Sequence, residues 1–155
     1  MTPSDYPRIN ALCQVAADLM QRCGLNVDLQ ATDWGTVIQR RASKGPVDQG
    51  GWSAFITTLT GADMYNPAAS LPLRGNGTNG WFGWPTAAEL ERLRDAWMAS
   101  TDQADQKRIA AQLQAQAFVD VPFLPLGQFF QPTVQHSSLA GALNGMPLFW
   151  NIRRT

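Results

Sequence analysis

The N-terminal part of the chain carries a helical pattern of apolar residues followed by a strand-like one. Apolar side chains first recur at three- and four-residue intervals, at Ile9, Leu12, Ala16 and Leu19. This spacing predicts an amphipathic helix that ends at Gly24. From Val27 to Ala31 apolar and polar residues alternate, as in a strand with one buried face. Asp33 is placed to cap a short helix from Trp34 to about Ala42, with Arg40 and Arg41 expected on its solvent side.

The middle of the chain predicts a buried strand followed by a long loop. From Trp52 to Leu59 apolar groups occupy both alternating faces, which favours a strand that is covered on both sides inside a sheet. Residues 60–85 are rich in glycine, proline and aromatic rings, and the segment is long for a plain solvated connection. Loops of this kind often carry function.

The C-terminal half predicts two helices, a short strand and a tail. Thr86 and Glu89 have the spacing of a capping box at the start of a helix. A second helix opens near Thr101 or Asp102 and must stop before Pro122. Their apolar faces are Leu90, Leu93 and Trp97 in the first helix and Ile109, Leu113 and Ala117 in the second. Phe123 to Phe130 is predicted to be a short, largely buried strand, and residues 130–155 an irregular tail that packs back on the body.

Alternating helices and strands indicate an α/β fold built in layers, with residues 1–155 forming a single domain. The series begins with a helix, whereas a right-handed crossover unit normally begins with a strand. We therefore expect that an N-terminal strand is missing and that the domain is truncated at that end.

Composition narrows the function classes. The 155 residues include 12 Lys plus Arg and 12 Asp plus Glu, and the pI is near 6.5. This balance offers no excess positive charge for phosphate or anionic lipid, so nucleic acid is not an expected partner. No stretch approaches the roughly 20 apolar residues of a spanning helix, and the N-terminus lacks the pattern of a secretion signal. The chain is either cytosolic or has lost a leader.

Neither a metal centre nor a catalytic group is predicted. Cys13 and Cys23 lie in one predicted helix, about 15 Å apart at about 1.5 Å rise per residue, whereas a disulfide needs Cα atoms within about 7 Å. His136 is the only histidine and cannot build a zinc site alone. Serine nucleophile motifs are absent around Ser53 and Ser70. We expect a protein without cofactor or metal that is not an enzyme.

Asp63 is the leading candidate for a binding residue. It follows the strand predicted to be buried on both faces, and ligands of open α/β sheets gather beyond the carboxyl ends of strands. The alternative is that Asp63 caps a local turn before Pro67. Trp81 also has two interpretations, a ring that stacks on a ligand or a ring that packs in the fold.

Four stretches of the chain are similar to a known family. They are Thr32-Asp33-Trp34 with Gln39-Arg40-Arg41-Ala42, then Gly61-Ala62-Asp63-Met64-Tyr65-Asn66-Pro67, then Trp81-Phe82-Gly83-Trp84-Pro85, and Asp120-Val121-Pro122-Phe123-Leu124-Pro125-Leu126-Gly127-Gln128. In this order they resemble the C-terminal lobe of the family 5 extracytoplasmic solute-binding proteins. These are the receptors of ABC importers for peptides, oligopeptides and nickel, and the resemblance spans nearly the whole chain.

The resemblance implies one lobe of a type II periplasmic-binding-protein fold, three-layered with a small mixed sheet. It also implies a missing N-terminal lobe, an ABC permease as membrane partner, and a periplasmic location with the leader absent. In peptide-binding members the aspartate that corresponds to Asp63 pairs with the ligand's α-amino group. Many members have an acidic residue where this chain has Asn66, which leaves other amine-bearing organic solutes open. Tyr65 and Trp81 would supply apolar walls with polar edges.

Two other hypotheses start from the same residues. The chain could be a carbohydrate-binding module or a glycosidase remnant that uses Trp81, Trp84 and a carboxylate pair, for which Asp33 and Asp63 are the candidates. It could also be a structural domain without a ligand. Because a missing strand would leave sheet edge or apolar surface exposed, a dimer of the chain is a further hypothesis.

Overall fold

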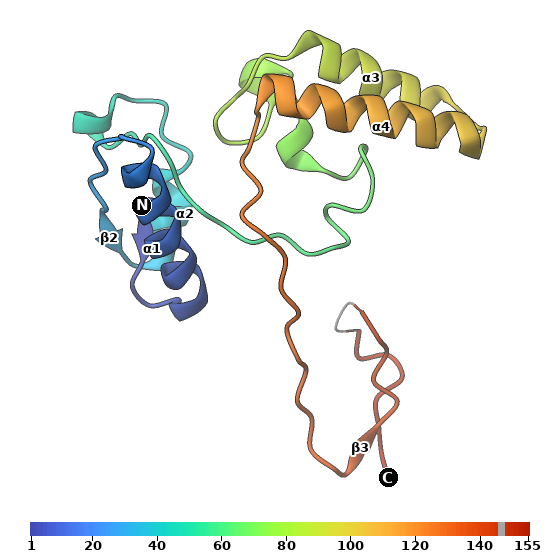
Figure 1. Ribbon diagram of the computed structural model, residues 1–155. Helices are drawn as coiled ribbons and strands as arrows, with labels where there is room; N and C mark the ends of the chain where they lie inside the picture. Colours follow the sequence, from blue (N-terminus) through green and yellow to red (C-terminus); the bar gives the residue numbers. More distant parts are fainter. Residues whose placement is uncertain (146–147) are drawn as a thin grey trace.

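The computed structural model of the protein describes residues 1–145 and 148–155 and shows a mixed α/β chain with two very small sheets. Its elements are β1 (Thr2–Pro3), α1 (Pro7–Arg22), β2 (Ala31–Thr32), α2 (Trp34–Arg40), α3 (Ala88–Ala99), α4 (Gln103–Asp120), β3 (Leu139–Ala140) and β4 (Arg153–Arg154). Figure 1 shows three parts: the unit around α1 and α2, the helix pair α3 and α4 with the loop beneath it, and a C-terminal tail that extends away from both.

The N-terminal unit is a β–α–β crossover followed by a second helix. β1 pairs with β2 in parallel, with Thr2 opposite Ala31 and Pro3 opposite Thr32. The unit buries an apolar set of Ile9, Cys13, Ala16, Ala17 and Val37. A strand therefore does precede the first helix, and the prediction that the chain lacks it was wrong. Two residues are too few to show a period-two pattern in the sequence.

The polar residues before α1 connect elements and do not cap the helix. The Asp5 Oδ1 atom accepts a hydrogen bond from the Trp34 backbone N–H at 2.8 Å, and the Ser4 hydroxyl donates to the Thr32 carbonyl at 3.0 Å. The start of α1 is thus fastened to the β2–α2 corner. Along the helix Cys13 is buried and Cys23 is exposed, and neither forms a disulfide within the described chain.

α2 begins as predicted, because the Asp33 side chain accepts from the Thr36 backbone N–H at 2.9 Å. Its arginines do not point to solvent as expected. Arg40 donates from Nη2 to the Gly51 carbonyl at 2.7 Å, and the Arg41 guanidinium lies over the Phe82 ring. The loop after α2 partly covers Arg40, whereas Phe82 partly covers Arg41.

The strand predicted from Trp52 to Leu59 is not formed, and this expectation was wrong. The segment starts beside β1, where the Met1 amino group donates to the Ala54 carbonyl at 3.0 Å. β1 contributes only two residues, so no ladder can extend along the remainder of the segment. Among the described residues, no other strand lies next to it.

α3 and α4 form an antiparallel hairpin with its own core, as the periodicity predicts. Its buried residues are Ala87, Leu90, Leu93, Ile109 and Leu113. α4 starts at the predicted cap, since the Asp102 side chain accepts from the Asp105 N–H at 2.7 Å. The capping box of α3 is not formed: the helix follows Ala87 without a side-chain cap, and Thr86 instead forms a β-bridge with Asn76.

The chain leaves α4 through Val121, which has a positive φ of 47°, and then runs extended. The strand predicted from Phe123 to Phe130 was wrong, because residues 122–135 make no backbone–backbone hydrogen bond within the described chain. Leu124 is 72% and Phe130 91% exposed. Unlike the helices, this segment has no neighbour that could satisfy its backbone.

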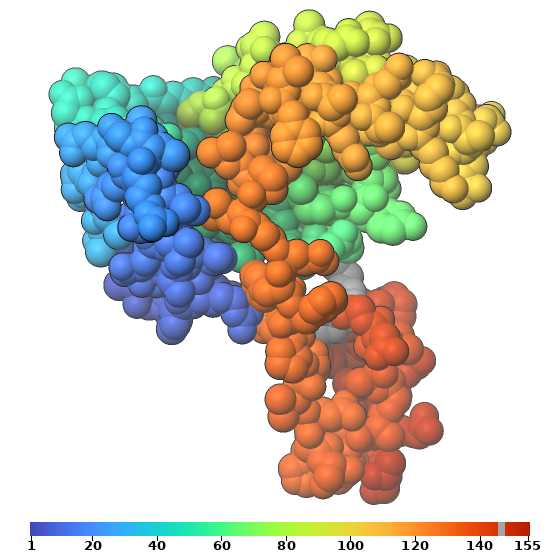
Figure 2. All heavy atoms as spheres, in the orientation of Figure 1, coloured from blue at the N-terminus to red at the C-terminus, as the bar shows by residue number. Residues whose placement is uncertain are grey.

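The tail ends in a small antiparallel pair of β3 and β4, with Leu139 opposite Arg154. Figure 2 shows this part projecting from the rest of the molecule. Phe149 and Trp150 are 74% and 83% exposed. The packing of residues 130–155 on a larger body therefore stays a prediction, as does the three-layered lobe.

Candidate functional site

Asp63 lies in a tight turn that opens with Thr60. Its Oδ2 atom accepts hydrogen bonds from the Thr60 N–H at 3.1 Å and from the Thr60 hydroxyl at 2.8 Å. Within the described chain Oδ1 accepts no hydrogen bond, and the residue is exposed. The carboxylate is therefore fixed by one oxygen and presents the other to solvent.

Of the next residues in this turn, Tyr65 is exposed and Asn66 is hydrogen-bonded locally. Tyr65 is 85% exposed, so its ring lies on the surface next to Asp63 in sequence. The Asn66 Oδ1 atom accepts from the Ala69 N–H at 2.9 Å, and the residue is half-buried. Asn66 thus provides the acceptor that a carboxylate would give, without the negative charge.

A buried ion pair fastens this turn to α3. Arg94 donates from Nε to the Pro67 carbonyl at 3.0 Å and from Nη1 to Glu91 Oε2 at 2.7 Å. The other Glu91 oxygen accepts from the Gly75 N–H at 2.6 Å. The side chains of Arg94 and Glu91 are only 6% and 25% exposed. Both ends of residues 67–75 are therefore held on the helix, which sets where the Asp63 turn emerges.

Trp81 belongs to a group of rings that pack on one another, here called the ring cluster. Its members are Trp52, Phe55, Trp81, Phe82 and Trp84. The Trp81 centroid lies 5.9 Å from that of Phe55 and 5.5 Å from that of Phe82. The Trp52 indole N–H donates to the Arg41 carbonyl at 3.0 Å. Trp81 is half-buried, so it packs in the fold and keeps part of its ring accessible.

The structure thus brings the predicted site residues into two places. Asp63, Tyr65 and Asn66 share one turn, whereas Trp81 lies in the ring cluster, and no hydrogen bond recorded for the described chain joins the two. Asp33 is used as the cap of α2, where hydrogen bonds from Thr36 lower the pKa of its carboxyl. The ring contacts were missed by the sequence reasoning, because residues near 52 and 82 show no shared periodicity.

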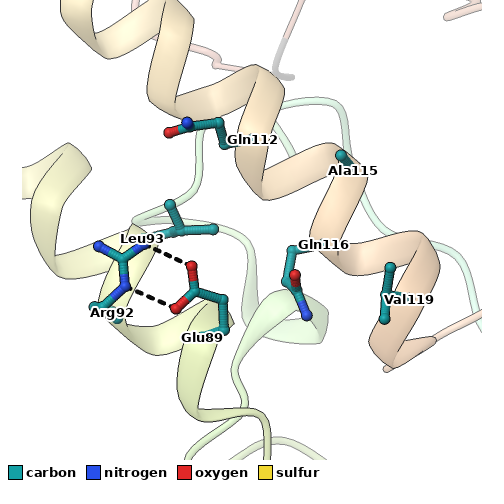
Figure 3. Close-up of a pocket in the computed structure, with 7 residues that line it drawn as sticks. All are labelled: Glu89, Arg92, Leu93, Gln112, Ala115, Gln116 and Val119. Carbon is teal, nitrogen blue, oxygen red and sulfur yellow. Dashed lines mark hydrogen bonds and ion pairs between the residues drawn. The ribbon is translucent and has the colours of Figure 1, made fainter.

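Two surface hollows lie away from these residues. One, of about 270 Å³, lies between α3 and α4 and is lined by Glu89, Arg92, Leu93, Gln112, Ala115, Gln116 and Val119. In Figure 3 the Glu89–Arg92 ion pair of α3 faces the glutamines of α4 across it. The other, of about 390 Å³, is lined by Tyr6, Pro7, Arg8 and Gln131. Neither is lined by a residue that the sequence predicted to bind a ligand.

The described residues show neither a metal cluster nor a spanning helix. Across positions 1–145 and 148–155, no three His, Cys, Asp or Glu side chains gather to hold a metal ion. In the same part of the chain, every helix is too short or too polar to cross a membrane.

The chain is similar to a transport protein over nearly its whole length. It is 34% identical over 152 residues to the "Probable peptide ABC transporter periplasmic-binding protein y4tO" of Sinorhizobium fredii. The aligned region covers 97% of this chain and 29% of that protein, so the chain spans less than a third of the relative's length. No protein-family profile matches the chain. The chain is therefore related to a periplasmic-binding protein.

Proposed function

We propose that this chain is a ligand-binding part of an ABC importer's substrate-binding protein and acts in the periplasm. It would bind a peptide or another amine-bearing organic solute and present it to a membrane permease. The observation that carries this proposal is the 34% identity across 97% of the chain to a periplasmic-binding protein. A binding protein needs a few oriented polar contacts and a wall that excludes water, but no reacting group.

The local geometry at Asp63 supports an amine ligand. One carboxylate oxygen is held by Thr60, and the other has no partner in the described chain. An ammonium group can donate to that second oxygen without displacing a bond of the turn. The exposed Tyr65 ring next to it can cover the apolar part of the solute. Because Asn66 is neutral, this position adds no second negative charge to the site.

The proposal includes a second lobe that closes over this site. An exposed ion pair contributes about 0.2–1 kcal/mol, whereas losing one partner of a buried pair costs about 2–5 kcal/mol. Asp63 is exposed, so in this chain alone its ion pair with a ligand would contribute only the smaller of these energies. The exposed apolar residues of 122–135, together with Phe149 and Trp150, are surfaces that such a lobe would cover. With this cover, the chain would form one lobe of the type II fold and its tail would pack back on the body.

The test is made on the full-length protein and compares a ligand with a free amine to the same ligand with its amine blocked. Calorimetry with trialanine should show binding, and either N-acetylation of the peptide or Asp63→Asn should weaken it by about 2–5 kcal/mol. Combining the two changes should add little, because both remove the same ion pair. Asp48→Asn is the matched control, since Asp48 is also exposed but lies in the short 3-10 helix Val47–Gln49. The 155-residue chain alone should bind trialanine more weakly than micromolar.

Equal affinity for trialanine and its acetylated form would refute the role of Asp63. Micromolar binding by the 155 residues alone would refute the need for a second lobe. Where that lobe is absent, we propose that the exposed apolar residues of 122–135 pair two copies of the chain. Sedimentation that shows only monomer at high concentration would exclude this dimer.

A further inference from the structure

Arg41 is held at three points beside the ring cluster. As the cap residue of α2, its N–H donates to the Val37 carbonyl at 3.0 Å. Its own carbonyl accepts from the Trp52 indole at 3.0 Å. The guanidinium carbon lies 4.3 Å from the centroid of the Phe82 ring, within cation–π distance. Two of these contacts fix the backbone at Arg41, and the third places its guanidinium over the cluster.

The guanidinium of Arg41 has no acceptor among the described residues. Its Nε atom is buried without a hydrogen-bond partner, and burial lowers the pKa of the group. By contrast, Arg92, Arg94 and Arg108 each pair with a carboxylate of their own helix. A guanidinium carries five N–H donors in a planar fork that matches a carboxylate. Burial of Nε without such a partner leaves this donor of the fork unsatisfied.

A second cation lies on the same cluster. The Lys44 Nζ atom is 4.8 Å from the centroid of the Trp84 ring, and no ion pair involving Lys44 is recorded for the described chain. Trp84 contacts Trp52, and Trp81 contacts Phe82, the ring beneath Arg41. Two unpaired cations therefore sit on one group of rings whose member Trp81 is partly accessible.

We propose that Arg41, assisted by Lys44, binds a carboxylate group of the ligand against the ring cluster. This inference rests on the proposed function and narrows its substrate class to solutes that carry a carboxylate as well as an amine. Polyamines and other amines without a carboxylate would then be excluded, because they leave the Arg41 fork without an acceptor. Trp81 would cover the apolar part of the solute next to its carboxylate.

The experiment uses the 155-residue chain and two probes of nearly equal shape, 3-phenylpropionate and its neutral amide 3-phenylpropanamide. Side-chain N–H signals of arginine and tryptophan are followed by ¹⁵N-resolved NMR. The carboxylate should shift the Arg41 Nε–H and the Trp81 indole signals saturably, and the amide should not. Arg41→Gln should weaken carboxylate binding about tenfold or more, as expected for loss of a charge-assisted contact. Arg108→Gln, which removes a surface cation of α4, should leave it unchanged.

Equal shifts with both probes, or unchanged carboxylate affinity in Arg41→Gln, would overturn the proposal. A thermal melt shows whether Arg41→Gln folds. If it does not, the proposal is tested by the wild-type Arg41 signal and by the carboxylate affinity of Lys44→Gln. We expect Lys44→Gln to lose affinity severalfold. Failure of the proposed function has a different signature. In that case peptide binding would ignore N-acetylation and Asp63→Asn, while 3-phenylpropionate would still shift the Arg41 signal.

Discussion

The hairpin of α3 and α4 and the segment 122–135 that follows it are both rich in apolar side chains, yet only the hairpin buries them. Leu113 in α4 is 1% exposed, whereas Leu124, eleven positions later, is 72% exposed. A helix satisfies its backbone within itself and needs one neighbour for its apolar face. An extended segment needs partners for its backbone as well as for its side chains. Local contacts therefore complete the helices here, whereas the strand-like segments depend on distant partners.

The same contrast exists around the proposed site. The loop that carries Asp63 is fastened to α3 by Arg94 and Glu91, so its position follows from the hairpin. The segment after α4 has no comparable anchor within the described chain. It contacts the N-terminal unit through Arg8, which donates a hydrogen bond to Gln131 and lies over the Phe129 ring. The turn that carries Asp63 is thus attached to the helix hairpin.

The largest expected effect compares one substitution in the two regions. Leu113→Ala should lower the free energy of unfolding by about 2–5 kcal/mol, because it leaves a cavity in the hairpin core. Leu124→Ala removes the same atoms from an exposed position and should change it by less than about 0.5 kcal/mol. Urea unfolding followed by far-UV circular dichroism measures both. Similar losses in the two variants would show that residues 122–135 are packed in solution as tightly as the hairpin core.

A smaller effect is expected at the anchor of the loop. Arg94→Met should cost about 3 kcal/mol, because it leaves Glu91 and the Pro67 carbonyl partly buried without their partner. Arg92→Met is the control on the same helix, and it should have little effect because the Arg92–Glu89 pair is exposed. The same unfolding measurement applies. If the two variants lost equal stability, burial of the Arg94 pair would not be what fastens the loop.

The smallest effect is a pH dependence at the start of α2. Hydrogen bonds from Thr36 lower the folded-state pKa of Asp33 below its ordinary value. This stabilisation is fully present above the unfolded pKa and is lost as the pH falls through the lowered folded pKa. The Thr36 amide signal, followed by NMR through that acidic range, should move with the titration of Asp33. Asp33→Asn keeps a cap acceptor that does not titrate, so a Thr36 shift that persists in this variant would assign the transition to another group.

The sequence predicted the elements whose signals are local. The Asp33 and Asp102 caps and the periodic Leu90, Leu93, Ile109 and Leu113 placed α2, α3 and α4 correctly. The strands expected at 52–59 and 123–130 were wrong, because apolar alternation says nothing about whether a partner strand is present. β1 was missed because two residues carry no period.

At the candidate site, the turn around Asp63 followed from its own residues, and the local-cap interpretation describes the bonds that it makes. The contacts of Trp81 with Phe55, and of Arg41 with Phe82, join positions between 26 and 41 residues apart. No spacing rule within one element can reveal such contacts. The binding roles of Asp63, Tyr65, Asn66 and Trp81 stay predictions.

Val121 sets the direction in which the chain leaves α4. A left-handed backbone costs a non-glycine residue about 1–2 kcal/mol, and Val121 holds a φ of 47° just before a proline. Residues 122–135 make no backbone hydrogen bond within the described chain. The torsion angles of Val121 therefore contribute directly to the orientation of the tail relative to α4. At about 3.3 Å per extended residue, the β3–β4 pair lies at most about 60 Å from Val121, so each degree of rotation there moves it by up to about 1 Å. A different ψ at Val121 would redirect the tail without breaking the hydrogen bond from the Val121 N–H to the Ala117 carbonyl, which closes α4.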